Sequence, residues 1–579
     1  MAIALTQIDN PAQLRALTPA ALDVLCDDLR RTLVETVAQT GGHLGSNLGV
    51  VELTVAIHRV FDSPADTILW DTGHQAYVHK LLTGRRERFD TLRQSEGISG
   101  YPCQAESLHD VIENSHASTA LAYAQGLATA RRLRREQGSV VAVVGDGALT
   151  GGLAYEALNN IGVRGERIVV VLNDNGRSYA PTVSRLFGPD GAAFGFFEAL
   201  GFDYEGPVDG HDLATLEKTL ERAKTHARPV VVHVHTTKGC GYEPALLDSE
   251  KCLHDTAPFD IATGRPHSST KQSWTNGFTE AMLAVGARRT DVVAISAAMV
   301  GSTGLLPFSD AYPDRSFDVG IAEQDAVTFA AGLAMAGLRP VVAIYSTFLS
   351  RAWDQIVNDV ALHRLPVIFC IDRAGVTGED GPSHNGVFDL ALLRNVPGML
   401  TLVPSCYDDI ALMLDEALAH VDGPTAIRWP KGAAPRAGLR PRPVPRRAQR
   451  LTQGDDACIL AVGPLLHDAV DAAHLLAQRG VTTTVWDVRC VAPLDPAMLA
   501  DASRHRVVVT CEDGLINGGV GERISAALTE SSDRLRPVVS RLGLPNRFLP
   551  HASRNELLAT FGLNASGIAE HVSAMLRAH

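Results

Sequence analysis

Two short apolar runs, each ending in polar residues, constrain the fold of this chain more than any other feature. Residues 140–144 lead into Gly-Asp-Gly at 145–147, and residues 168–172 lead into Asn-Asp-Asn at 173–175. Residues 151–162, between the two runs, have the character of a helix. Strand, turn, helix and strand in this order predict parallel strands of an α/β fold, whose ligands gather at the carboxyl ends of the strands.

Oxygen ligands follow both predicted strands. Asp146 and Asn175 fall at the two carboxyl ends, and the backbone carbonyl of Arg177 lies just beyond. Carboxylate, amide and carbonyl oxygens suit Mg²⁺, which takes further ligands from phosphates. Gly145 and Gly147 would let a phosphate approach the backbone closely. We therefore predict a metal site at Asp146, Asn175 and Arg177; the alternative is that Gly-Asp-Gly is only a turn.

The bulk composition indicates ordinary packed cores and excludes several kinds of partner. Hydrophobic residues make up 45% of the 579, and the net charge of −13 argues against nucleic acid or an anionic membrane as partner. The nine cysteines form no Cys-x-x-Cys pair, which argues against a zinc or disulfide framework and suits a reducing cytosol. With no signal peptide and no membrane-length apolar run, we predict a cytoplasmic protein.

Apolar runs and helical stretches alternate along the whole chain. This alternation predicts an α/β fold of three successive α/β domains with mainly parallel sheets. The predicted domains are 1–262, 274–434 and 451–579. Residues 263–273, polar and rich in helix breakers, and 435–450, rich in Pro and Arg, are the predicted linkers.

The motif around Asp146 and Asn175 resembles the thiamine-diphosphate motif of the transketolase-like enzymes. Further stretches that match lie at 41–46, 51–54, 70–77, 115–119, 320–324, 345–348 and 372–375. The last of these, Asp-Arg-Ala-Gly, leads on to Asp380 and His384, and is the most specific part of the match. Taken together, residues 22–563 resemble the 1-deoxy-D-xylulose-5-phosphate synthase family.

This resemblance implies a transferase that decarboxylates pyruvate and joins the two-carbon remainder to D-glyceraldehyde 3-phosphate, on the way to isoprenoids and thiamine. The implied cofactors are thiamine diphosphate and Mg²⁺. The first domain would bind diphosphate and metal, the second the pyrimidine ring, and the third would be the C-terminal transketolase-like domain. The implied assembly is a homodimer.

The resemblance also assigns roles to single residues. The implied catalytic residues are His43, His74, Glu323, Asp380 and His384. The implied cofactor-binding residues are His74, Ser115, His116, Ser118, Gly145, Asp146, Gly147, Ala148, Asn175, Lys238, Ile321, Glu323 and Phe348. The implied substrate-binding residues are His43, His254, Tyr345, Arg351, Arg373, Asp380, His384 and Lys431.

Each role has a physical reason and a plainer alternative. Glu323 would place a carboxylate against the pyrimidine ring for acid–base work through the cofactor; alternatively, it is a helix N-terminal glutamate favoured by the dipole. Imidazoles such as His43 and His74 titrate near working pH, although many histidines are only structural. Phe348 and Ile321 would contact the cofactor or simply pack in a core.

Arg373 and Lys431 would bind the phosphate of the aldehyde, because a phosphate attracts fixed cations. Lys431 stands where the family often has arginine, and lysine lacks the bidentate fork. The alternative for Lys431 is a solvated surface lysine.

Two departures from the family pattern stand out. The segment after Asn175 is short where the family usually carries a longer mobile insert, so we predict altered kinetics before altered chemistry. Asp325 stands where the family usually has histidine. A second carboxylate there could raise the pKa of Glu323, although residues two apart on a helix point apart.

Three other functions remain open from the sequence. The chain could be a relative that uses another acceptor aldehyde, or a catalytically silent cofactor-binding homologue. A transketolase proper is disfavoured by the stretch from 372 to His384.

Overall fold

The structure is a computed structural model that describes residues 5–186, 193–267, 272–436, 444–530 and 536–579. Parts of both predicted linkers and of the short segment after Asn175 lie outside the described residues. The chain divides into two compact units, Met1–Ser269 with Gly320–Ala322, and Thr270–Val319 with Glu323–His579.

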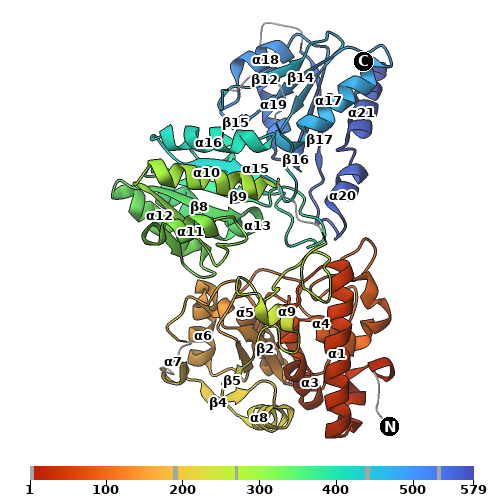
Figure 1. Cartoon of the computed structure of the whole chain (residues 1–579), viewed down its shortest axis with the longest axis vertical. Coiled ribbons are helices and arrows are strands. Elements are labelled where there is room, and N and C mark those ends of the chain that lie inside the picture. The colour runs from red at the N-terminus through yellow and green to blue at the C-terminus, as the bar shows by residue number, and fades with distance from the viewer. Residues whose placement is uncertain (1–4, 187–192, 268–271, 437–443, 531–535) are drawn as a thin grey trace. The chain divides into compact units, whose positions relative to one another are not determined.

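A five-stranded sheet is the framework of the first unit (Figure 1). Its strand order is β1-β2-β3-β5-β4, and each neighbouring pair is parallel. The strands are β1 (Thr67–Trp70), β2 (Val140–Gly145), β3 (Val169–Asp174), β4 (Asp203–Asp209) and β5 (Val230–His235). The near-continuous valine runs of β2, β3 and β5 suit strands that are covered on both faces.

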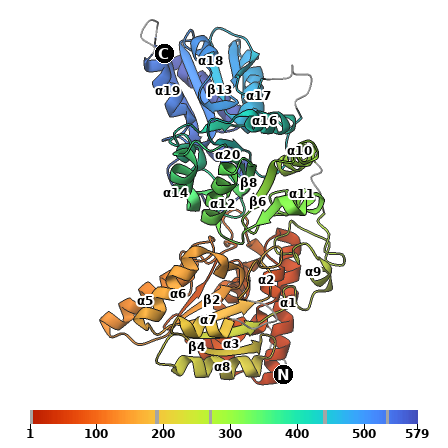
Figure 2. The ribbon, with the colours of Figure 1, turned by 90° about the vertical axis from the view of Figure 1, so that its left-hand side faces the viewer.

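Helices cover both faces of this sheet. One face packs against α5 (Ala120–Arg134), α6 (Gly152–Arg164) and α7 (Ala193–Ala199). The other face packs against α3 (Val51–Val60) and α8 (Leu213–Thr225). Figure 2 shows α5 and α6 side by side along the sheet. A further core joins α1 (Pro19–Thr40), α2 (Gly45–Leu48), α4 (Tyr77–Lys80) and α9 (Glu243–Leu247).

The long helix α1 delivers the first predicted histidine. The Thr18 side chain caps its N-terminus by accepting from the amide of Ala21, and Pro19 occupies the first turn. Gly41 ends the helix with φ of +71°, and an added Cβ there would lie 2.8 Å from the Thr256 carbonyl oxygen. Only glycine fits this bend, which turns the chain toward His43.

The second unit holds two sheets. The first has the order β15-β10-β11-β9-β8-β6-β7, parallel except for the antiparallel edge strand β15. Its strands are β6 (Val292–Ser296), β7 (Ser316–Asp318), β8 (Arg339–Tyr345), β9 (Ile368–Asp372), β10 (Leu400–Leu402), β11 (Thr425–Arg428) and β15 (Cys490–Ala492). Its helices are α10 (Trp274–Arg288), α11 (Leu306–Ala311), α12 (Glu323–Met335), α13 (Ser346–Leu349), α14 (Trp353–Gln355), α15 (Asp389–Leu393) and α16 (Tyr407–Ala419).

The other sheet of this unit has the order β12-β14-β13-β16-β17, with β12 antiparallel at the edge. Its strands are β12 (Gln449–Thr452), β13 (Ala457–Ala461), β14 (Thr483–Asp487), β16 (Val507–Leu515) and β17 (Val538–Leu544). Its helices are α17 (Leu466–Ala477), α18 (Pro496–Ala502), α19 (Val520–Glu530), α20 (Arg554–Thr560) and α21 (Ala565–Ala578).

These three sheets confirm the predicted fold class; among their described strands, antiparallel pairing is confined to the edge strands β12 and β15. The exact domain boundaries stay a prediction. Among the described helices, none is long and apolar enough to cross a membrane.

Candidate active site

The carboxylate of Asp146 lies buried just beyond the carboxyl end of β2. The Asp146 amide donates to the Asn173 carbonyl at 3.1 Å, and the Asn175 amide donates to the Asp146 carboxylate. The structure therefore brings Asp146 and Asn175 together. Burial raises the pKa of Asp146 to about 6, partly offset by a hydrogen bond from Thr182. A buried carboxylate with a raised pKa is under-compensated in charge, and a divalent cation would supply that compensation.

Asn175 shapes the turn that carries the third predicted ligand. Its Oδ1 accepts from the Arg177 amide at 3.1 Å, which is an Asx turn. The Arg177 guanidinium donates to the carbonyls of Ser249 and Glu250 at 2.7 and 3.0 Å. Its side chain therefore secures the loop, and only its backbone carbonyl is a candidate ligand.

The described part of the short segment after Asn175 folds onto the predicted site. The Ser178 carbonyl accepts from Lys238 Nζ. The Tyr179 and His254 rings have centroids 4.1 Å apart. Thr182 Oγ1 donates to Asp146 Oδ2 at 2.5 Å. Although it is short, this segment contacts both Asp146, a predicted metal ligand, and His254.

Three predicted histidines gather in the first unit. The His43 ring centroid lies 5.6 Å from both His74 and His254, and His74 stacks on His254 at 4.9 Å. Lys238 Nζ donates to His254 Nδ1 at 2.7 Å. Burial lowers the pKa of Lys238 to about 7 and, with the nearby Lys238 charge, holds the pKa of His254 well below its usual value. A neutral imidazole and a lysine that releases its proton easily thus lie side by side.

Asn47 anchors this histidine group, and sequence reasoning missed it. Its Nδ2 donates to the carbonyls of His43 and His74, both at 2.8 Å, and its Oδ1 accepts from the Tyr77 amide at 2.8 Å. Asn47 is fully buried. No local pattern separates this asparagine from a surface one, because two of its partners, His74 and Tyr77, are distant in the sequence.

Asp71 is a second anchor that the sequence analysis did not single out. Its carboxylate accepts from the amides of Ser118 and Ala120 at 2.8 and 3.0 Å. Ser118 in turn donates through Oγ to the Ala148 carbonyl at 2.6 Å. This chain of bonds ties the predicted diphosphate turn at 115–118 to the Gly-Asp-Gly turn.

The remaining cofactor candidates of this unit lie close to the same turns. The His116 amide donates to Asn114 Oδ1 at 2.9 Å and so forms a local turn. Ser115, in the same turn, is buried. Ile321, which belongs to the first unit, donates from its amide to Thr150 Oγ1 at 2.8 Å. Its Cδ1 would lie 3.7 Å from a Cβ added at Gly147. Ile321 therefore lies directly beside the Gly-Asp-Gly turn.

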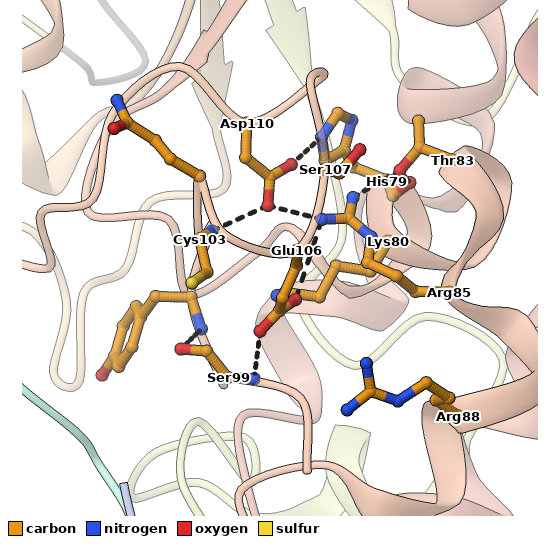
Figure 3. Close-up of polar contacts among 12 residues, drawn as sticks. His79, Lys80, Thr83, Arg85, Arg88, Ser99, Cys103, Glu106, Ser107 and Asp110 are labelled. Carbon is orange, nitrogen blue, oxygen red and sulfur yellow. Dashed lines mark hydrogen bonds and ion pairs between the residues drawn. The ribbon is translucent and has the colours of Figure 1, made fainter. Parts of the chain in front are cut away.

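A buried network of charges fixes the segment from Ser99 to Asp110 (Figure 3). Lys80, completely buried, donates to Glu106 at 2.5 Å, and Glu106 accepts from the Ser99 amide at 2.6 Å. Asp110 accepts from Arg85 at 2.5 Å and from the Cys103 amide at 2.7 Å.

This charge network has a consequence for the histidine group. Tyr101 lies within the fixed segment, and its ring centroid is 5.6 Å from that of His43. By fixing this segment, the charge network also fixes the position of the Tyr101 ring against His43.

Glu323 opens α12 in the second unit and is 4% exposed. Burial raises its pKa, and the Arg351 guanidinium, with Nε 3.5 Å from Glu323 Oε2, opposes the shift. Asp325 is exposed, so its side chain points to solvent. The cause of the raised pKa is therefore burial and not the extra carboxylate.

Aromatic rings and a guanidinium gather beside the end of β8. Tyr345 and Phe348 stack with centroids 5.8 Å apart, and Phe348 meets His384 edge-on at 5.6 Å. The Arg373 guanidinium lies over the Tyr345 ring at 4.4 Å and pairs with Asp372 at 2.6 Å. Four of the predicted residues thus form one group.

Lys431 lies beside acids. Its Nζ is 3.2 Å from Asp380 and 3.5 Å from Glu379. A phosphate bound there would compete with both carboxylates, so the role predicted for Lys431 requires these pairs to rearrange.

The residues present fit the implied cofactor and metal within each unit taken by itself. In the first unit, Asp146 is a buried carboxylate whose charge is only partly compensated, and a Cβ added at Gly145 would meet open space. In the second unit, Glu323 is a buried carboxyl, and Tyr345 and Phe348 supply a stacked aromatic pair. Oxygen donors suit Mg²⁺, and a buried carboxyl and aromatic rings suit a protonatable heterocycle.

Comparisons with known proteins identify the family of this chain. A family model described as 1-deoxy-D-xylulose-5-phosphate synthase matches residues 5–188 and 191–236. Models of the transketolase pyrimidine-binding and C-terminal domains match 270–436 and 446–568. The 1-deoxy-D-xylulose-5-phosphate synthase of Thermobifida fusca is 48% identical, covering 99% of this chain and 97% of that protein. The chain belongs to the 1-deoxy-D-xylulose-5-phosphate synthase family.

Other members of the family are similar to the same degree. The synthase of Parafrankia sp. is 47% identical over 98% of this chain and 95% of that protein. The synthase 1 of Kitasatospora griseola is also 47% identical, over 99% of this chain and 95% of that protein.

Among solved structures, a transketolase from Campylobacter jejuni aligns with 96% of this chain and 100% of its own chain at 18% identity, with a TM-score of 0.47.

Proposed function

We propose that this chain condenses pyruvate with D-glyceraldehyde 3-phosphate to give 1-deoxy-D-xylulose 5-phosphate and CO₂, with thiamine diphosphate and Mg²⁺. The observation that carries the proposal is the 48% identity to a relative of that name over 99% of the chain. The buried carboxyl groups Asp146 and Glu323 support it, because each suits one part of the cofactor.

In this proposal the first unit holds the metal and the diphosphate. Asp146, Asn175 and the Arg177 carbonyl would bind Mg²⁺, and the turns at 115–118 and 145–147 would receive the phosphates. Thiamine diphosphate, when bound, supplies an electron sink for decarboxylation. His43 and His74 would orient the carbonyl and hydroxyl groups of the substrates and take part in proton transfer. His254, whose lowered pKa keeps its imidazole neutral, would bind substrate.

The second unit would hold the pyrimidine ring and the aldehyde. Glu323 would bind the ring nitrogen and hold a proton there, and Phe348 would stack on the ring. His384 and Asp380 would position a substrate hydroxyl. Arg373 and Lys431 would bind the phosphate, with Arg373 held over Tyr345.

The experiment that tests the proposal is a mass-spectrometric product assay with pyruvate and D-glyceraldehyde 3-phosphate, with and without thiamine diphosphate and Mg²⁺. We expect 1-deoxy-D-xylulose 5-phosphate only when the substrates and both cofactors are present. CO₂ release without this product would show that D-glyceraldehyde 3-phosphate is not the acceptor. Absence of both the product and CO₂ would show that the chain does not catalyse this reaction.

The homodimer implied by the resemblance and the cytoplasmic location predicted from the sequence are part of the same proposal. Light scattering of the purified chain measures the first directly. A mass of twice 61.8 kDa is the expected result.

A further inference from the structure

A second set of metal-type ligands lies in the first unit, beside the proposed Mg²⁺ site but made of side chains that have no part in it. Asp174 ends β3, and His233 and His235 lie in β5. Ligand atoms from these three side chains all lie within 4.8 Å of one another. Asp174 is the register partner of His235, and residues two apart on a strand share a face. All three side chains therefore project from the same face of the sheet.

The distances between these atoms suit a small tetrahedral cation. His233 Nε2 is 2.9 Å and His235 Nδ1 is 3.7 Å from Asp174 Oδ2. Ligands at zinc-like bond lengths around a tetrahedral ion lie about 3.3 Å apart. The two measured separations bracket that value, so an ion would require only small side-chain shifts.

A partner outside the triad fixes the ring of His233. Tyr204, on the neighbouring strand β4, has its hydroxyl 2.6 Å from His233 Nδ1. A metal would bind the lone pair of Nε2 in the neutral tautomer that carries its one proton on Nδ1, and this Nδ1–H would donate to the Tyr204 oxygen. Such a bond to the second ring nitrogen orients metal-binding histidines and strengthens their binding.

The exposed His235 side chain would let a cation reach these three ligands from solvent. Asp174 and His233 are 8% and 6% exposed, whereas the His235 side chain is 56% exposed. A cation would therefore reach the site from solvent on the His235 side and keep one water as its fourth ligand.

We propose that Asp174, His233 and His235 bind one transition-metal dication of the zinc class. Two imidazoles and one carboxylate suit zinc, whereas Mg²⁺ prefers oxygen ligands alone. The site is distinct from the proposed Mg²⁺ site, because its nitrogen ligands come from β5 and Asp146 takes no part in it.

The test is an isothermal titration of Zn²⁺ into the full-length chain with Mg²⁺ in large excess, followed by Co²⁺ absorption spectra that report histidine ligands. We expect one equivalent of Zn²⁺ to bind. His235→Val should weaken binding at least about tenfold. This variant should fold, because it changes a half-exposed side chain and leaves the bonds among Tyr204, His233 and Asp174 intact.

Two further variants make the result specific. His226→Val is the matched control, since His226 also contacts two carboxylates, Asp203 and Glu205, at 2.9 and 3.1 Å; its Zn²⁺ binding should equal that of the wild type. Asp146→Asn removes a proposed Mg²⁺ ligand and should also leave Zn²⁺ binding unchanged. Absence of Zn²⁺ binding, a wild-type response of His235→Val, or loss in Asp146→Asn would each overturn the proposal. None of these readouts depends on turnover, so they are separate from the test of the proposed function.

Discussion

At the scale of single residues, burial of Glu323 opposes the ionisation of its carboxyl group. Burial raises its pKa above 4.5, and Arg351 only partly offsets the shift. A carboxyl group with a raised pKa in the folded chain adds stability below its unfolded pKa and loses that contribution as pH rises through the folded pKa. Near neutral pH the ionised form therefore lowers the free energy of unfolding.

Glu323→Gln should accordingly stabilise the cofactor-free chain near neutral pH while removing most activity. We expect a higher free energy of unfolding in urea at neutral pH, with the gain shrinking below pH 4.5, and kcat lowered roughly 10²–10⁴-fold. Asp325→Asn, two residues along and exposed, is the control and should change neither quantity. A gain that persists unchanged in acid would contradict the assignment.

Asn47 is the second test at this scale. Asn47→Ala removes three hydrogen bonds of a fully buried side chain and leaves the carbonyls of His43 and His74 without this donor. We expect the free energy of unfolding to fall by about 1–3 kcal/mol or more, and kcat/KM to fall with it. Asn160→Ala, which removes an exposed bond to the Glu156 carbonyl, is the control. Equal effects of the two variants would show that Asn47 is not an anchor.

At the scale of elements, the segment from Ser99 to Asp110 depends on buried ion pairs. Glu106→Gln would leave Lys80 buried without its counter-charge, which should destabilise the chain by about 3–5 kcal/mol. Adding Lys80→Met removes the unpaired charge, so the double variant should recover part of the loss. Urea unfolding and hydrogen exchange of this segment measure both effects. A double variant that is less stable than Glu106→Gln would contradict the argument.

The segment after Asn175 gives a second prediction for an element. Thr182 donates to Asp146, the carboxylate proposed to bind Mg²⁺. If the metal must displace this bond, Thr182→Val should tighten Mg²⁺ binding about tenfold, in line with about 1.5 kcal/mol for a hydrogen bond to a charged group. Thr182→Ser keeps the hydroxyl and should bind as the wild type does. The Mg²⁺ dependence of thiamine diphosphate binding is the measurement, and weaker binding in Thr182→Val would refute this competition.

At the scale of the whole molecule, a buried arginine links the two sheets of the second unit. Arg428, at the end of β11, donates to Asp389 at 2.8 Å and to the Asp513 carbonyl in β16 at 3.1 Å. Asp389 and Arg428 are almost fully buried, and burial raises the pKa of Asp389. The contact joins strands of different sheets into one cooperative body.

Arg428→Met should therefore destabilise both sheets of that unit together. We expect a loss of about 3–5 kcal/mol, seen in hydrogen exchange as lower protection of both β11 and β16, with β2 and β3 of the first unit unchanged. Arg436→Met removes an exposed pair with Asp408 and should cost at most about 1 kcal/mol. Loss of protection confined to β11 would contradict the coupling.

The sequence alone determined the framework of this protein. Apolar runs such as 140–144 and 168–172 became buried parallel strands, because a strand covered on both faces must be apolar along its length. The positions of Asp146 and Asn175 followed from the same pattern, since parallel strands end at one edge. The alternation of apolar runs and helical stretches gave the α/β fold class, and the family resemblance then supplied most of the other candidate residues.

Only the tertiary structure decided what surrounds those candidates. No local sequence pattern predicts three of these contacts: the bond from Asn47 to His43, the pairing of Lys80 with Glu106, and the pairing of β15 with β10. The pairing of Asp174 with two histidines of β5 also depends on strand register. Local patterns report burial and periodicity, whereas these contacts depend on which distant segments share a face, and that is fixed only when the sheets are assembled.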